Sequence, residues 1–132
     1  MAPNPRIRID PAAGTPVVRQ IVDRLRILLV EGQLVPGETL PSVRRVAMEL
    51  GIHFNTVAEA YRQLAAEGWL DLKHGRSAVV VPRLVPAVEN DAWIDDFRNR
   101  LRGIVAQMRS QGVTGAGIAA ELRAMAKAVT RS

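Results

Sequence analysis

The feature that most constrains the fold is a change in the period of the apolar residues near position 69. Before this point, apolar side chains recur every three or four residues in three successive segments, as they do in amphipathic helices. After it, residues 69–72 alternate between apolar and polar, and the valine-rich run 78–81 follows a glycine-containing turn at 73–76. This second pattern is typical of a β-hairpin. Three helices and a hairpin within residues 15–82 predict a winged helix-turn-helix, which is a mainly α fold with a small β-hairpin.

Capping residues set the expected limits of the three helices. We expect Thr15 to cap the first helix, with Pro16 at its first helical position. The second helix is short; it opens at Ser42 and stops at Gly51. The third helix runs from His53 to Glu67. The face of this third helix that we expect to be buried consists of Val57, Ala60, Tyr61 and Leu64.

Proline residues indicate where one part of the chain ends and the next begins. Pro82 and Pro86 bracket a linker, and a second helical pattern follows it. The predicted segments are an N-terminal segment at 1–14, a winged helix-turn-helix DNA-binding domain at 15–82, a linker at 83–90 and a two-helix region at 91–130. Within the first segment, the alternating residues 7–9 could add an edge strand.

The two helices expected after the linker each carry an apolar stripe. Together the stripes hold more apolar surface than two lone helices can bury against each other. We therefore expect a helical interface with a second copy of the chain, which predicts a homodimer. The predicted interface residues are Trp93, Phe97, Leu101, Ile104 and Met108 on the first helix, and Ile118, Leu122 and Met125, followed by Val129, on the second.

The short helix, the glycine and the longer helix that follows form a pair whose second helix can lie in the major groove of DNA. The N-terminal outer face of that second helix is polar or able to contact base edges. Asn55 can read adenine, Thr56 can read either base edge or a thymine methyl group, and Phe54 can make only apolar contact. The candidate DNA-contacting residues on this helix are His53, Phe54, Asn55, Thr56 and Arg62.

Other candidate residues are placed to contact phosphates. Ser42 begins the preceding helix and Arg44 and Arg45 follow it, so side chains and the helix N-terminus offer donors together. The hairpin turn adds donors with no acid beside them, and its glycine lets the backbone approach closely. The residues of this turn are Lys73, His74, Gly75 and Arg76.

A purely structural role remains open for several of these residues. His53 can serve as a helix cap, and Arg45 and Arg62 can be ordinary solvated side chains on a helix surface. Tyr61 and Trp69 are expected to lie in the core and not to stack on bases.

Composition argues against other classes of protein. The net charge is +5 and 16 of the 18 basic residues are arginine, which favours an anionic partner such as nucleic acid. With no cysteine, only two histidines and no glycine-rich phosphate loop, the sequence predicts no enzyme, no cofactor and no metal site. No apolar run approaches the roughly 20 residues of a membrane span, and the N-terminus lacks the pattern of a signal peptide. We therefore expect no membrane partner and a cytoplasmic location.

The joined motifs resemble the DNA-binding domain of the GntR family of transcription regulators over about residues 15–81. They are Pro16 with Gln20-Ile21, Gly32-x-Leu34-x-Pro36-Gly37, Leu40-Pro41-Ser42-x-Arg44, Asn55-Thr56-Val57, Ala60-Tyr61, Leu64 and Gly68. The two-helix remainder is similar to the YtrA subfamily, because it leaves no room for the larger ligand-sensing or aminotransferase-like domains of other branches.

This resemblance implies a winged helix that dimerises through its C-terminal helices. It implies a regulator, usually a repressor, that binds an inverted-repeat operator in double-stranded DNA, often beside a transporter operon; the effector ligand is unknown. Carried over by position, the DNA contacts are Arg44, Phe54, Asn55, Thr56, His74 and Gly75. The chain departs from the family at Phe54, where arginine is common, and at Ser77 and Val79, where the wing commonly has a glycine and an aromatic residue.

One other function class stays open. A winged helix can also serve as a protein-interaction module that does not bind DNA. A gel-shift assay against the DNA upstream of the protein's own gene distinguishes this alternative from a DNA-binding regulator.

Overall fold

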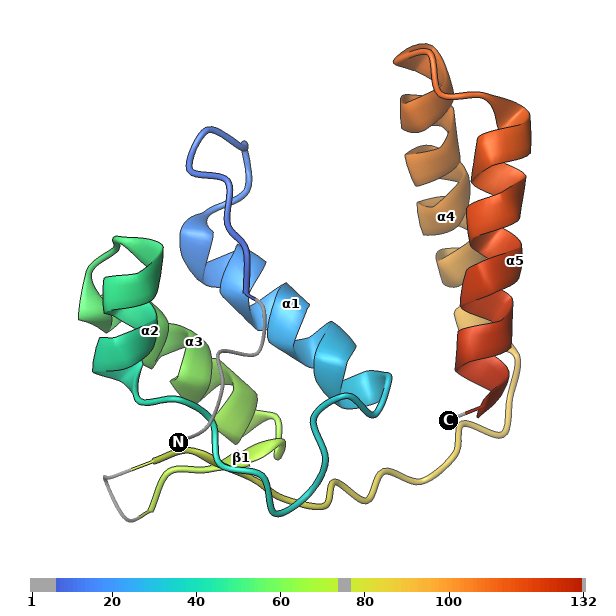
Figure 1. Cartoon of the computed structure of the whole chain (residues 1–132). Coiled ribbons are helices and arrows are strands. Elements are labelled where there is room, and N and C mark those ends of the chain that lie inside the picture. The colour runs from blue at the N-terminus through green and yellow to red at the C-terminus, as the bar shows by residue number, and fades with distance from the viewer. Residues whose placement is uncertain (1–6, 74–76, 132) are drawn as a thin grey trace. The chain divides into compact units, whose positions relative to one another are not determined.

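The computed structural model describes residues 7–73 and 77–131 (Figure 1). The chain divides into two compact units, of which the first ends at Leu84 and the second begins at Val85. Across the described part of the chain, no helix is both long enough and apolar enough to cross a membrane.

The described residues of the first unit form three helices and one antiparallel pair of strands. These elements are α1 (Val17–Val30), α2 (Val43–Leu50), α3 (Phe54–Ala66), β1 (Leu70–Asp71) and β2 (Val79–Val80). In the hairpin Leu70 pairs with Val80 and Asp71 with Val79, and an isolated bridge joins Thr39 to Val79. The prediction of a mainly α-helical winged helix with a small hairpin is therefore confirmed.

Most of the expected helix limits are confirmed by capping geometry. Ser42 caps α2, since its hydroxyl oxygen accepts a 3.1 Å hydrogen bond from the backbone N–H of Arg45. Gly51 ends α2 in the left-handed conformation at φ +69°, which glycine adopts without steric cost. Thus α2 and α3 are separated by a sharp turn, as the two helices of a helix-turn-helix require.

The start of α1 differs from the prediction. Pro16, not Thr15, is the N-cap, because its backbone is extended (φ −56°, ψ 147°) and lies outside the helix. Its carbonyl oxygen accepts the first intrahelical bond from the Gln20 N–H at 3.1 Å. The side chain of Gln20 also reaches back to the Thr15 carbonyl oxygen at 2.9 Å, so a side-chain amide satisfies the backbone there.

The core of the first unit lies between α1, α2, α3 and the hairpin. The expected buried face of α3 is confirmed, and Ile21, Leu25 and Leu28 of α1 are buried against it. Residues 7–9 do not form the edge strand that their alternation suggested, but Ile7 is buried in the same core. The apolar alternation of this segment thus reflects burial of a side chain and not strand pairing.

The hairpin is shorter than the sequence suggested. Residues 69–72 and 78–81 were expected to pair. Within these described segments the ladder pairs are those of β1 and β2, and the Val81 N–H donates one more hydrogen bond to the Trp69 carbonyl oxygen at 3.0 Å. The carboxylate of Asp71 accepts a 2.8 Å bond from the N–H of Lys73. The side chain of Asp71 thus bonds the backbone immediately after the strand, as aspartate commonly does in turns.

The second unit consists of α4 (Ala92–Ser110) and α5 (Gly115–Arg131), which are antiparallel in Figure 1. Gly112 lies in the turn at φ +95°, and the Thr114 hydroxyl caps α5 by accepting from the Gly117 N–H at 3.1 Å. None of the α4 side chains is fully buried within the chain. The exposed apolar residues of the pair are Trp93, Phe97, Ile104, Leu122, Met125 and Val129, while Leu101, Met108 and Ile118 are half-buried.

Candidate nucleic-acid interface

The first turn of α3 is organised by His53. The imidazole Nδ1 of His53 accepts a 3.0 Å hydrogen bond from the N–H of Asn55, so His53 is the N-cap of the helix. The capping role left open by the sequence is therefore present. The side chain of Asn55 is exposed and that of Thr56 is half-buried, both on the same turn.

Phe54 lies between side chains from two helices. Its ring stacks on the imidazole of His53, with centroids 4.9 Å apart and planes 23° apart. The guanidinium carbon of Arg44, on α2, lies 5.7 Å from the centroid of the same ring. The structure thus brings Arg44 of α2 against the adjacent residues His53 and Phe54 in one exposed cluster, which we call the Arg44–Phe54–His53 stack.

Arg45 and Arg62 each pair with an acid one helical turn away. Arg45 Nε lies 3.0 Å from a Glu49 carboxylate oxygen, and Arg62 Nη2 lies 2.9 Å from Glu59. The hydrogen bond from Arg62 lowers the pKa of Glu59 below its usual value. An acid on the same helix therefore partly neutralises the charge of each of these two arginines. Fewer unpaired positive charges are left here than a count of basic residues suggests.

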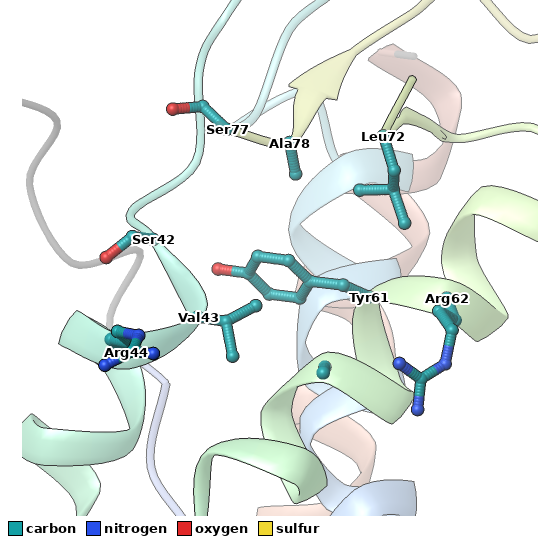
Figure 2. A pocket seen from close by; sticks show the side chains of 9 residues that line it. Ser42, Val43, Arg44, Tyr61, Arg62, Leu72, Ser77 and Ala78 are labelled. Carbon is teal, nitrogen blue, oxygen red and sulfur yellow. The ribbon is translucent and has the colours of Figure 1, made fainter. Parts of the chain in front are cut away.

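A surface hollow of about 320 Å3 lies between the start of α2, the middle of α3 and the hairpin residues Leu72, Ser77 and Ala78. Figure 2 shows Tyr61 reaching from α3 toward the start of α2, with Arg44 on the far side and Arg62 directed away from the tyrosine ring. The polar residues that line the hollow are Ser42, Arg44, Arg62 and Ser77. A donor-bearing concave surface of this kind is suited to an anionic backbone.

Of the predicted wing residues, Lys73 falls within the part of the chain that the structure describes. Lys73 is exposed, and Asp71 does lie beside it, which corrects the expectation of a turn without a neighbouring acid. His74, Gly75 and Arg76 fall outside the described residues. Ser77, one of the two departures from the family's wing pattern, is exposed and lines the hollow.

Two supporting contacts join residues that lie far apart in the sequence. Arg83 stacks on Trp69 at 4.8 Å and its Nε donates a 2.7 Å bond to the Glu67 carbonyl oxygen. Arg26 makes a two-pronged contact with the Glu67 carboxylate, at 3.1 and 2.6 Å. These residues hold the end of α3 to α1 and to the segment after the hairpin, and no local sequence pattern links positions so far apart.

Comparisons with known proteins agree with this geometry. The model of the bacterial regulatory proteins of the gntR family matches residues 17–80. The HTH-type transcriptional repressor YtrA of Bacillus subtilis (strain 168) is 38% identical over 74 residues. That match covers 56% of this chain and spans 57% of the length of the Bacillus relative.

Solved structures give the same result over more of the chain. YtrA from Sulfolobus acidocaldarius, a GntR-family transcription factor, is 33% identical with a TM-score of 0.57, and the match covers 76% of this chain and 97% of that one. A transcriptional antiterminator from Listeria monocytogenes EGD-e has a TM-score of 0.63 over 92% of this chain and 91% of its own, but at 21% identity it supports the fold alone.

The family-level interpretations of the sequence are therefore confirmed. Three findings point to the same family. They are the helix-turn-helix with its hairpin, the match to the family model, and the match to 97% of YtrA from Sulfolobus acidocaldarius. The family consists of DNA-binding transcription regulators and not of enzymes. The chain belongs to the GntR family of bacterial regulatory proteins.

Proposed function

We propose that the chain acts as a homodimeric repressor that binds an inverted-repeat operator in double-stranded DNA. In this proposal residues 15–82 contact DNA, residues 83–90 link the two parts, and residues 91–130 form the dimer. The regulated genes would be neighbouring ones, such as a transporter operon.

The first turn of α3 is the main support for DNA binding. Its exposed side chains, led by Asn55 and Phe54, lie beside exposed Arg44, while the opposite face of α3 is buried in the core. Such a helix can enter the major groove without losing its packing. The preceding helix contributes the Ser42 cap and Arg44 at its N-terminal end, where backbone N–H groups also favour phosphate.

Exposed apolar surface on the second unit supports the dimer. Trp93 and Phe97 meet edge to face, with ring centroids 5.7 Å apart, and about half of each side chain is exposed. Ile104 lies two turns further along the same stripe. A second copy that covered these stripes would bury on the order of 2,000 Å2, as in stable dimers. The twofold axis of such a dimer would then match a palindromic operator.

The repressor role is supported by the name of the Bacillus subtilis relative, which is a repressor. A DNA-binding domain can repress transcription by occupying DNA that RNA polymerase needs. The direction of regulation is measured by comparing transcript levels of the flanking genes in cells with and without the gene for this chain. Higher levels without the protein are expected, whereas lower levels would make it an activator.

The decisive test of DNA binding is a gel shift with the DNA upstream of the protein's own gene. We expect a discrete complex that unlabelled specific DNA removes and that a shuffled duplex does not. Equal competition by both duplexes, or no complex at 50 to 150 mM salt, would favour the protein-interaction module instead. The variant Arg44→Ala, which alters an exposed side chain, should weaken the complex, while Arg123→Ala on α5 serves as a charge-matched control.

A further inference from the structure

Phe54 is the exposed residue in the first turn of α3 that carries no hydrogen-bonding group on its side chain, since the apolar Val57 of the same turn is buried. Its exposed fraction is 46%, at a point where the proposed function places the helix against base edges. Exposing aromatic surface to water is unfavourable in free energy, and a ligand that covers this surface removes the unfavourable contribution. Phe54 is therefore suited to contact an apolar group on the DNA.

The ring of Phe54 is held in place before any ligand arrives. His53 stacks on it, and the His53 ring is itself fixed by the hydrogen bond that its Nδ1 accepts from the N–H of Asn55. Arg44 covers the ring from α2. A side chain ordered in this way loses little conformational entropy on binding, so its contacts contribute more fully to affinity.

The major groove offers one apolar group, which is the 5-methyl group of thymine. We infer that Phe54 is a specificity-determining residue that reads a thymine in each half-site by contact with this methyl group. The inference rests on the proposed function, since it assumes that α3 lies in the major groove. Asn55, next in the chain, would read a neighbouring base pair by hydrogen bonds.

A stacking role for Phe54 on a base is less compatible with the geometry. Bases in an intact duplex are stacked on one another and present only their edges to the groove. One side of the Phe54 ring is already covered by His53. A contact between the edge of the Phe54 ring and a thymine methyl group requires no unpaired base, and His53 can stay stacked on the ring.

The test uses the full-length protein and duplexes that it selects from a randomised pool. Each thymine of the best duplex is replaced in turn by deoxyuridine, which keeps every hydrogen-bonding group and removes only the methyl. At one symmetric thymine pair, single replacement should weaken binding about fourfold and double replacement about 15-fold, as expected for one buried methyl per half-site. Phe54→Ala should bind the thymine and uracil duplexes equally, whereas Phe54→Leu should keep the preference for thymine.

Controls separate this contact from a general loss of structure. Ile27→Ala removes an equally exposed apolar side chain (45%) from the far end of α1, and should leave the thymine preference intact. Circular dichroism shows whether each variant keeps its helices. Phe54→Arg should move the preference at the same base pair toward guanine, which arginine contacts with two hydrogen bonds.

Failure of this inference differs from failure of the proposed function. If the wild-type chain selects no sequence, both fall. If it selects a sequence, but every deoxyuridine duplex binds as tightly as the parent, the proposed function stands and Phe54 does not read thymine. The inference is also overturned if Phe54→Ala keeps the full preference for the methyl group.

Discussion

The Tyr61 hydroxyl of α3 donates a 2.8 Å hydrogen bond to the backbone carbonyl oxygen of Pro41, immediately before the Ser42 cap of α2. The bond is buried, and burial raises the pKa of Tyr61, so the hydroxyl keeps the proton that it donates. It ties the start of α2 to the middle of α3, and thereby sets where Arg44 lies relative to the proposed recognition surface. This long-range bond thus helps to connect the core to the candidate site, together with the buried Val46 and Ala47 of α2.

Tyr61→Phe removes this bond and keeps the ring. Because a buried acceptor then loses its donor, we expect the free energy of unfolding to fall by about 1–2 kcal/mol. DNA affinity should also fall under conditions where the variant is fully folded, since α2 is less firmly placed. Urea unfolding followed by circular dichroism measures the first effect and a gel shift the second. An unchanged unfolding midpoint would mean that water satisfies the Pro41 carbonyl oxygen equally well once the hydroxyl is gone.

The Arg26–Glu67 pair should make stability depend on pH. The hydrogen bond from Arg26 lowers the pKa of Glu67, so the carboxylate stabilises the fold above its unfolded pKa of about 4.3, and this contribution is lost as the pH falls through the folded-state pKa. With 39% and 32% of the two side chains exposed, the pair should contribute only about 0.5 kcal/mol. Glu67→Gln should therefore be less stable than wild type at pH 7 and equal to it near pH 3.5.

The control for this prediction is Glu31→Gln, which removes the same charge from an exposed position at the end of α1. Its effect on the urea midpoint should be small at both pH values. A constant difference between Glu67→Gln and wild type across the range would mean that the amide disturbs packing rather than an ionic contact.

Ile104→Asp should dissociate the proposed dimer. The side chain is 56% exposed, so the acid disturbs little within one chain but places a charge inside the proposed interface. Ala106→Asp is the matched control, because helical spacing puts it on the opposite, exposed face of α4. Sedimentation at micromolar concentration should give a monomer for the first variant and a dimer for the second. A wild-type chain that sediments as a monomer would refute the dimer itself.

Salt dependence should reveal which arginines contact phosphate. The logarithm of DNA affinity should fall with the logarithm of salt concentration at a slope steeper than about −4, because two copies of Arg44, Arg45, Lys73 and Arg76 offer up to eight contacts. Arg44→Ala should flatten this slope more than Arg45→Ala, since Arg45 already pairs with Glu49. Lys73→Ala should weaken all sequences about equally. Identical slopes for wild type and all three variants would exclude these contacts.

Asn55→Ala should separate base reading from positioning. We expect a loss of about 1–3 kcal/mol on the selected operator and much less on operators altered at one base pair, because a hydrogen-bonded base contact is lost. Arg44→Ala should cost roughly 2 kcal/mol or more on every operator, since a charge-assisted contact is lost from both half-sites. A uniform loss for Asn55→Ala, with the ranking of operators unchanged, would mean that Asn55 only positions the protein.

The sequence by itself determined the elements and their inner faces. The buried side of α3, the Ser42 cap and the glycine that ends α2 all follow from residues within about one helical turn of each other. The prediction from local sequence was wrong where two neighbouring residues could each begin the helix. Thr15 and Pro16 can both start a helix; in the structure Pro16 is the N-cap, and the Gln20 side chain donates a hydrogen bond to the Thr15 carbonyl oxygen.

Only the tertiary structure decided how the site is assembled. Tyr61 and Pro41 are 20 residues apart and Arg26 and Glu67 are 41 apart, so no pattern of spacing pairs them. The stack of Arg44 on Phe54 likewise joins two helices. Helical periodicity fixes which side of each helix faces inward, but the position of one helix along another is set by the packing of all the core side chains together. Contacts across that packing therefore become known only when the whole core is assembled.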